Sequence, residues 1–518
     1  MKHAPLPPLP MPLFGSERVL ATVALSLATF MNVLDSTIAN VSLPAIAGDM
    51  GVSPNQGTWV ITSFAVSNAI AVPLTGWLAQ RFGQVKLFVA SILLFVLTSL
   101  ACGLATSLPM LIGFRVLQGL VAGPMIPLSQ ALLMRCYPKE KSAMALAAWS
   151  MTTLVAPVMG PILGGWLTDN LSWPWIFYIN IPVGLGAAWA TWSILHRRES
   201  TTRQVPVDYV GLGLLVLWVG ALQIMLDKGR ELDWFASGEI IGLAAVAFMS
   251  FCFFLVWELH DDHPIVDLHL FQRRNFSVGV LTMALGYGLF FGNVVLMPLW
   301  LQQYMGYTST WAGLVTAPIG FFAILLTPVV GKIMPKTDPR RLATVAFLVF
   351  ATVCFLRSGF SNEADVYTIV VPQVVQGIAM ATFFVPLTAL SLSGLPPERI
   401  PSASGMANFV RITFGAFGAS ISTTVWDDRS ALHHARLMEH ISPFDPAVQA
   451  SLSATQGAGL DAAQSLAFME RQVTVQSHTM GANDFFWISG VLFLILMALV
   501  WLARPEKAGK PVDAGGAH

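Results

Sequence analysis

The segment FMNVLDSTIANVSLPAI, residues 30–46, contains a single acidic residue, Asp35. Sixteen uncharged residues precede this aspartate, from Val19 to Leu34, and the next charged residue is Asp49. An ionised carboxylate in an apolar environment costs on the order of several kcal/mol, so isolated acids inside apolar helices usually have a function. The segment therefore predicts an apolar helix that carries one functional acid.

The composition of the whole chain agrees with this segment. Of its 518 residues, 55% are hydrophobic and 11% are charged, and the mean hydropathy is +0.66. A soluble domain has about 25% charged residues, so we expect an integral membrane protein. The net charge of +0 argues against a nucleic-acid partner. The spacing of the 4 cysteines favours neither disulfides nor a metal site.

Windows of about 20 apolar residues are long enough to span a bilayer as helices. Fourteen such spans are predicted: 19–42, 56–79, 86–105, 109–133, 142–167, 174–195, 210–226, 238–257, 276–301, 311–333, 342–358, 367–392, 403–426 and 485–503. With the N-terminus inside, 20 of the 28 lysines and arginines fall on the cytoplasmic side. Both termini are therefore predicted to be cytoplasmic. Six cations are then outside: Lys228, Arg230, Arg357, Arg429, Arg436 and Arg471.

The sequence contains a weak internal repeat. FRVLQG (114–119) recurs as PQVVQG (372–377), and PKEK (138–141) recurs as PPER (396–399), both at a shift of 258 residues. Duplicated halves are common in secondary transporters, so we expect six helices, two inserted helices and six more helices. The predicted boundaries are a cytoplasmic tail 1–18, a six-helix bundle 19–195, a linker with two inserted helices 196–275, a second six-helix bundle 276–503 with a periplasmic loop 427–484, and a cytoplasmic tail 504–518.

Several motifs resemble the fourteen-helix drug:proton antiporter family of the major facilitator superfamily. These are LDSTIANVSLP (34–44), GWLAQRFGQVKL (76–87), FRVLQGLVAG (114–123) and APVMGPILGG (156–165), with further similarity in WPWIFYINIPVG (173–184), DKGRELDWF (227–235) and PIVDLHLFQRRNF (264–276). The motif at 76–87 departs from the superfamily pattern, because Gln80 and Gln84 replace an acidic and a basic residue. The resemblance implies an all-α major facilitator fold with no cofactor. It also implies a periplasmic adaptor protein and an outer-membrane channel as partners.

Asp35 and Arg115 are the predicted proton-coupling residues. Burial disfavours the ionised form of a carboxylate and a nearby cation favours it, so a buried acid beside a cation can exchange a proton. Arg115 is always charged and needs a partner inside its apolar helix, and Asp35 is the obvious one. The alternatives are a structural hydrogen bond for Asp35, and backbone carbonyls as the partners of Arg115. The repeat counterpart of Arg115 is neutral Gln373, so proton chemistry is expected in the first half alone.

A second group of residues is predicted to serve gating. In APVMGPILGG two prolines remove backbone donors, and two glycines form a GxxxG face that permits close helix contact. We interpret this helix as a hinge that restricts proton leak, with helix packing as the alternative. The predicted gating and hinge residues are Gly76, Arg81, Gly83, Pro157, Gly160, Pro161, Gly164 and Gly165.

The sequence is less specific about the substrate. Amphipathic aromatic molecules suit the polar and aromatic residues of the central helices. The candidate substrate residues are Asn32, Gln118, Tyr287, Phe290, Asn293, Gln373, Gln376, Phe384, Asn408 and Arg411. Arg411 either binds anionic substrates or braces the cytoplasmic gate. In loop 427–484, Asp461 is a candidate helix cap, and three histidines (His433, His434 and His440) lack a metal-ligand pattern, so a docking surface is favoured.

These features predict a secondary transporter and not an enzyme, since the chain has no GxxxxGK[ST] phosphate-binding motif. We expect a proton-driven antiporter that exports hydrophobic drugs across the bacterial inner membrane. Export of a specific endogenous metabolite or siderophore by the same mechanism is the alternative. A membrane scaffold that does not transport is a third interpretation, which the presence of Asp35, Arg115 and the antiporter motif disfavours.

Overall fold

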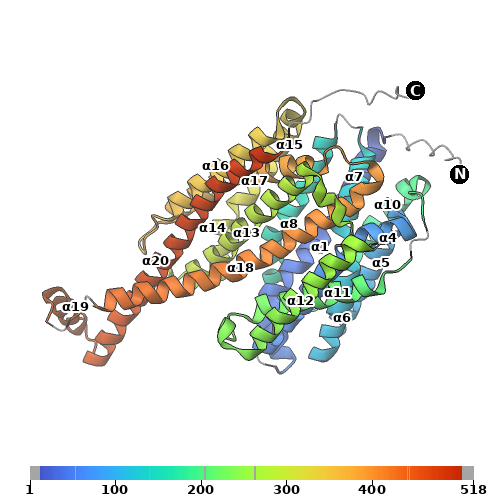
Figure 1. Ribbon diagram of the computed structural model, residues 1–518. Coiled ribbons are helices and arrows are strands. Elements are labelled where there is room, and N and C mark those ends of the chain that lie inside the picture. The colour runs from blue at the N-terminus through green and yellow to red at the C-terminus, as the bar shows by residue number, and fades with distance from the viewer. Residues whose placement is uncertain are drawn as a thin grey trace.

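The computed structural model describes residues 12–52, 54–138, 141–203, 206–261, 264–439, 441–442 and 444–504 (Figure 1). Within these ranges the regular structure is entirely helical. The tails predicted at the two ends of the chain lie for the most part outside these ranges, in residues 1–11 and 505–518.

The first six predicted spans form one bundle. Its helices are α1 (Gly15–Asp49), α2 (Pro54–Gly57), α3 (Trp59–Ala71), α4 (Thr75–Phe82), α5 (Gln84–Gly103), α6 (Leu108–Ala122), α7 (Met125–Cys136), α8 (Ser142–Asn170), α9 (Trp175–Tyr178) and α10 (Asn180–Leu195). Helices α3 and α4 together make one span, which bends by 61° at the break around Pro73. Proline removes a backbone donor and disfavours the helical conformation of the preceding residue, which accounts for the break.

Two inserted helices and a second bundle follow. The inserted helices are α11 (Tyr209–Lys228) and α12 (Gly238–His260). The second bundle contains α13 (Arg274–Gln303), α14 (Ser309–Thr316), α15 (Pro318–Ile333), α16 (Pro339–Arg357), α17 (Val366–Leu392), α18 (Ile400–Glu439), α19 (Pro446–Gly457) and α20 (Ala462–Leu499). The turn between α14 and α15 lies directly before Pro318, again at a proline.

The two bundles pack their helices in corresponding pairs. In the first bundle α1 packs on α8, α3 on α6 and α5 on α10. In the second bundle α13 packs on α18, α15 on α17 and α16 on α20. These pairs match in chain order, so the weak sequence repeat corresponds to a structural duplication with α11 and α12 inserted between the halves.

Each of the fourteen predicted spans corresponds to a helix or a broken helix. Among the described residues, 10 helices are long and apolar enough to cross a membrane, and the bent pair α3–α4 makes up to 11. The other three predicted spans are α8, α10 and α18. Helix α10 has 16 residues, and α18 has 40 residues, with Arg411 as the one charged residue before Asp427.

Residues 427–484, predicted as a loop, are mostly helical. Helix α18 continues to Glu439, and α20 begins at Ala462, so the two helices project from the second bundle with α19 at the tip (Figure 1). Asp461 and Gln464 form the predicted cap, each side chain bonding to the other's backbone N–H. The arms pair through Asp484, which binds Arg429 at 2.6 Å and His433 at 2.7 Å. We call residues 427–484 the hairpin.

Candidate functional site

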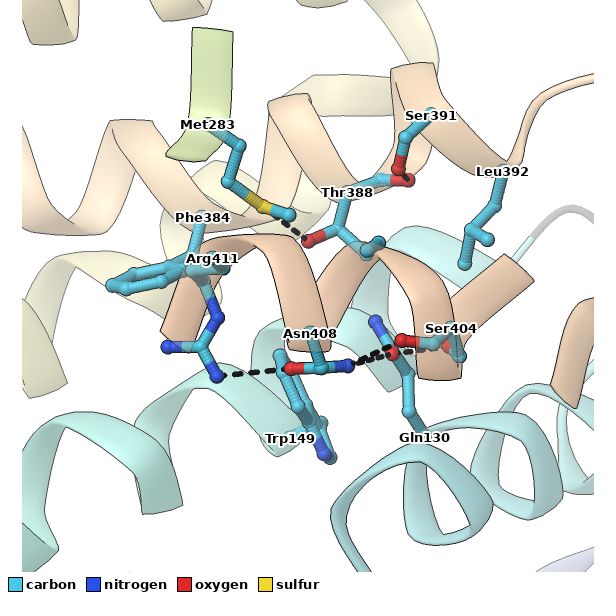
Figure 2. Close-up of a pocket in the computed structure, with 11 residues that line it drawn as sticks. Gln130, Trp149, Met283, Phe384, Thr388, Ser391, Leu392, Ser404, Asn408 and Arg411 are labelled. Carbon is cyan, nitrogen blue, oxygen red and sulfur yellow. Dashed lines mark hydrogen bonds between the residues drawn. The ribbon is translucent and has the colours of Figure 1, made fainter. Parts of the chain in front are cut away.

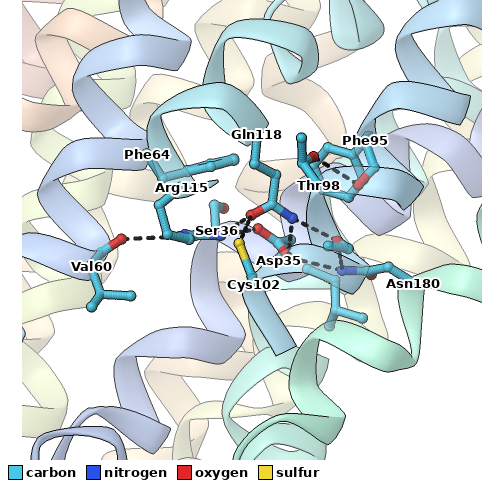
Figure 3. Close-up of polar contacts among 12 residues, drawn as sticks. Asp35, Ser36, Val60, Phe64, Phe95, Thr98, Cys102, Arg115, Gln118 and Asn180 are labelled. Atoms are coloured by element: carbon cyan, nitrogen blue, oxygen red, sulfur yellow. Dashed lines mark hydrogen bonds and ion pairs between the residues drawn. The ribbon is translucent and has the colours of Figure 1, made fainter. Parts of the chain in front are cut away.

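Asp35 lies at the centre of a buried polar cluster in the first bundle (Figure 3). Its carboxylate Oδ2 accepts from Arg115 at 2.6 Å, and both side chains are essentially inaccessible to solvent. The other oxygen, Oδ1, accepts from Asn180 Nδ2 at 2.9 Å and from Gln118 Nε2 at 3.2 Å. Asn180 and Gln118 both also donate to Ser99 Oγ, at 3.1 and 2.7 Å. The carboxylate therefore has partners from α6 and α10, and a second layer on α5.

Arg115 is held on three sides. Its Nε donates to the carbonyl of Val60 at 3.0 Å, and the nitrogen that contacts Asp35 also donates to Gln118 Oε1 at 2.7 Å. The guanidinium lies 4.2 Å from the ring centroid of Phe64, within the range of a cation–π contact. The direct contact with Asp35 confirms the predicted pairing, and Val60 shows that a backbone carbonyl contributes as well. A buried ion pair of this kind needs both partners, because either charge alone would be uncompensated.

The second bundle contains a corresponding cluster without an acid. Asn293 on α13 is close to Cys354 on α16 and to Ser489 on α20, at 3.8 and 3.4 Å. Gln373 and Gln376 on α17 take the places that Arg115 and Gln118 have in the repeat, and both accept from Arg357. The distance from Arg357 to Gln373 Oε1 is 2.9 Å.

Arg357 is a site residue that sequence reasoning missed. It was counted among the extracytoplasmic cations, yet it is 1% exposed and belongs to the end of α16. Its Nε has no hydrogen-bond partner, and none of the ion pairs among the described residues includes it. In the sequence, Arg357 lies at the end of the apolar window 342–358. This position is equally consistent with a buried cation and with one at the membrane surface.

A small central pocket lies between the two bundles (Figure 2). Helices α7 and α8 contribute Gln130 and Trp149, and the second bundle contributes Phe384, Asn408 and Arg411. Arg411 donates to Asn408 Oδ1 at 2.9 Å, and Asn408 donates to Gln130 Oε1 at 3.3 Å across the bundle interface. The lining includes no carboxylate, so the cation of Arg411 faces the pocket without a counter-ion there.

Only some of the other candidate substrate residues lie near this pocket. The rings of Tyr287 and Phe384 lie 4.7 and 5.7 Å from the Arg411 guanidinium. Phe290 packs against Phe350 at 6.0 Å. Asn32 donates to the carbonyl of Ala122 at 3.1 Å. Four more belong to the buried clusters instead of the pocket: Gln118, Asn293, Gln373 and Gln376.

The predicted hinge glycines bring α8 against α1 beside the acid. A Cβ built on Gly160 would overlap Thr37, and one built on Gly164 would lie 2.8 Å from Ile38. Gly165 follows on the same helix. Pro157 and Pro161 fall within α8, but their side chains lie outside the described residues. The GxxxG face therefore packs within one turn of Asp35.

The motif at 76–87 lies where α4 meets α5 and the other bundle. A Cβ on Gly76 would overlap Ser402 of α18, so this glycine permits contact between the two bundles. Gly83 has a φ of +89°, which L side chains rarely adopt. The exposed guanidinium of Arg81 lies 5.4 Å from the ring centroid of Trp77.

Two bundles with matching helix pairs, a pocket between them and a buried carboxylate–guanidinium pair define a secondary transporter. The Major Facilitator Superfamily profile matches residues 25–419. The multidrug export protein EmrB of Escherichia coli K12 is 52% identical, with 98% of this chain and 99% of that protein covered. The fatty acid resistance protein FarB of Neisseria gonorrhoeae is 48% identical, with 98% and 99% covered.

The chain therefore belongs to the major facilitator superfamily and, within it, to the EmrB family of multidrug efflux transporters. The fold agrees with that of the human organic anion transporter MFSD10, with a TM-score of 0.56 at 15% identity, covering 94% of this chain and 100% of that one. The predicted family, fold class and transporter function are confirmed, and the chain is a multi-pass membrane protein.

Proposed function

We propose that the protein exports amphipathic, hydrophobic molecules in exchange for protons, with Asp35 as the proton carrier and Arg115 as its counter-ion. The observation that supports this most is the environment of Asp35, a fully buried carboxylate joined to a fully buried guanidinium. An acid buried inside a membrane helix is costly, and such acids are therefore usually functional. Substrate export follows from the family and from the name of the EmrB relative.

In this mechanism one proton neutralises the Asp35 carboxylate and weakens its ion pair with Arg115. The contacts of Asp35 with α6 and α10 then change together, because Gln118 and Asn180 bind the same oxygen. Helix α8 packs on α1 through Gly160 and Gly164, so a shift of α1 reaches the bundle interface. Release of the proton on the opposite side of the membrane restores the ion pair between Asp35 and Arg115.

The test is drug transport by the purified protein in liposomes with an imposed pH difference. Asp35→Asn removes the titratable group and keeps the side-chain shape, so drug movement should fall to that of protein-free liposomes. Asp169→Asn is the matched control, because Asp169 is an exposed acid on α8. Full gradient-driven transport by Asp35→Asn would reject Asp35 as the carrier.

We infer that the substrates of the central pocket include anions. Arg411 is 6% exposed, lines the pocket and has no carboxylate beside it there. FarB carries the name of a fatty acid resistance protein, and fatty acids are amphipathic anions. A charged hydrogen bond contributes about 1.5–3 kcal/mol, so Arg411→Gln should raise KM for an anionic aromatic substrate roughly ten- to hundredfold. A cationic substrate of the same size serves as the control, and an equal change for both would reject the proposal.

We further propose that both termini are cytoplasmic and that the protein lies in the bacterial inner membrane. The hairpin then faces the periplasm, where an adaptor protein of the EmrA type and an outer-membrane channel would complete a tripartite efflux system. Its exposed apolar side chains support a docking role, since Leu466 is 58% and Phe468 44% exposed. Leu466→Asp with Phe468→Asp should abolish co-purification of the adaptor and leave transport in liposomes intact. Unchanged co-purification of the adaptor with the double variant would reject this surface.

A further inference from the structure

The connection between the two inserted helices bonds to both bundles. It comprises the last two residues of α11 and the loop that leads to α12, residues 227–237, and we call it the strap. On the first bundle, Thr62 of α3 donates to the Asp227 carboxylate at 2.5 Å. Lys228 Nζ donates to Thr58 Oγ1, directly before α3, at 3.4 Å. The strap is therefore attached to one end of α3.

The same strap reaches α18 of the second bundle. Arg230 forms an ion pair with Asp427 at 2.8 Å, and these side chains are 51% and 37% exposed. The indole Nε1–H of Trp234 donates to Thr424 Oγ1 at 2.9 Å. The motif DKGRELDWF (227–235), which the proposed transport steps do not use, thus supplies contacts to both bundles.

At the opposite end of these helices the two bundles touch directly. A Cβ on Gly76 would overlap Ser402, and one on Gly405 would lie 3.1 Å from the carbonyl oxygen of Val72. Ser402 and Thr424 are 22 residues apart on α18, so this contact lies about 33 Å from the strap at about 1.5 Å per residue. Alternating access rocks the bundles against one another, so α3 and α18 must shift relative to each other at the strap.

The inserted helices are fixed more firmly to the first bundle than to α18. Helix α11 packs on α3 more extensively than on α18. A cavity of about 700 Å³ lies between α18 and the inserted helices. Their contacts with α18 include the rings of Trp218 and Phe409, 5.5 Å apart, and a bond from Ser420 Oγ to the carbonyl of Leu226 at 2.8 Å. When the bundles rock, we therefore expect the inserted helices to move with α3.

The bonds from the strap to α18 are easily broken. An exposed ion pair such as Arg230–Asp427 contributes little to stability, because water can replace each partner. Trp234 reaches Thr424 from a turn in which Asp233 and Trp234 have φ values of +54° and +49°. Residues other than glycine are strained in this region, so release of Trp234 would let the turn relax.

We propose that the strap is a latch between the inserted helices and α18. It holds α18 in one state of the transport cycle, and it releases α18 in the other state while it stays bound to α3. The strap bonds to both bundles at the end where α3 and α18 must shift, and this position carries the proposal. The latch rests on the export function proposed above, but it does not require Asp35 to be the proton carrier.

The test cross-links the strap to either side in the whole protein in liposomes, with Cys252→Ser as the background. Arg230→Cys with Asp427→Cys allows a link to α18, and Lys228→Cys with Thr58→Cys allows the matched link to α3. A short bis-methanethiosulfonate forms each link, mass spectrometry confirms it, and a reductant removes it. The link to α18 should stop drug transport until the reductant is added. The link to α3 should leave transport unchanged.

The opposite results would overturn the latch. Normal transport with the α18 link in place would show that the strap need not release α18. Loss of transport with the α3 link would show that the strap must leave α3. A monofunctional methanethiosulfonate on the α18 pair is the control for chemical modification, and it should not stop transport. Equal inhibition by the two reagents would overturn the latch as well.

A second measurement does not require drug transport. Spin labels at Glu231 and at either Asp428 or Gln56 report the distance from the strap to α18 or to the start of α3, since all three positions are exposed. Gly76→Val would meet Ser402 and push the touching ends of the bundles apart. The distance from 231 to 428 should then change, and that from 231 to 56 should not. Any other pattern would overturn the latch. If the unmodified protein moves no drug, the export function alone is rejected, because these distances decide the latch separately.

Discussion

At the scale of single residues, the buried arginines of the two bundles have different partners. In the first bundle Arg115 has the carboxylate of Asp35 as its partner, whereas in the second Arg357 has two glutamine carbonyls. A proton can neutralise the carboxylate of Asp35 and so break its ion pair with Arg115, but an arginine among amides keeps its charge over the whole physiological range. The proton-sensitive element is therefore expected in the first bundle, and the buried arginine of the second bundle has no titrating partner among the described residues.

Removal of Arg115 should shift the pH dependence of efflux. Arg115→Ala leaves the buried Asp35 without its counter-charge, which favours the protonated carboxylic acid. Proton release becomes the blocked step, so efflux should be weak at neutral pH and partly restored at higher pH. Arg115→Lys keeps the charge without the planar fork and should have a smaller defect. The measurement is efflux against pH at a fixed pH difference and matched expression.

Arg357→Gln is the matched control for that measurement, because it also removes a buried arginine. It should lower efflux at all pH values alike, since no acid pairs with Arg357 among the described residues. A parallel decrease for Arg115→Ala, with the pH profile of the unmodified protein, would show a structural role for Arg115. Equal alkaline shifts in both variants would place proton coupling in both bundles.

At the scale of helices, α8 packs closely on α1 beside the acid. Gly160 and Gly164 allow α8 to approach α1 at Thr37 and Ile38, two and three residues after Asp35. A side chain at either glycine would push the helices apart or force α1 to turn. Contacts between α4 and α18 depend in the same way on Gly76 beside Ser402. Small residues thus determine where helices meet in this membrane fold.

Gly164→Val should destabilise the first bundle and impair coupling. Its side chain would meet Ile38, and overpacking of this kind costs about 1–3 kcal/mol. We expect a lower melting temperature in detergent and slower proton-driven efflux. Gly186→Ala on α10 is the control, since a Cβ there has nothing within 4 Å. An unchanged melting temperature and rate for Gly164→Val would show that the two helices do not need this contact.

At the scale of the whole molecule, the orientation remains a prediction from the distribution of charges. Single cysteines at Gln456 in the hairpin and at Thr202 between α10 and α11 test it, because both positions are exposed. The background should carry Cys252→Ser, since Cys252 is the exposed natural cysteine. A membrane-impermeant maleimide should label position 456 in intact spheroplasts, and position 202 after lysis. The reverse pattern would invert the topology.

The membrane class and the spans could be predicted from the sequence, and so could Asp35 as the favoured partner of Arg115. Each of these depends on local composition, because a bilayer requires about 20 apolar residues per span and makes an isolated charge conspicuous. The duplication could also be predicted, since two motifs recur at a shift of 258 residues. The cap at Asp461 could be predicted as well, because its partner Gln464 is only three residues away in the sequence.

The other partners of this ion pair could be found only in the tertiary structure. The partners of Asp35 include Gln118 and Asn180, which are 83 and 145 residues away, and no local pattern joins them. The burial of Arg357 and the helical form of 427–484 likewise depend on neighbouring helices. Lipid tails are as apolar as the helices, so hydrophobicity does not select which helices pair. Packing between helices therefore determines these sites.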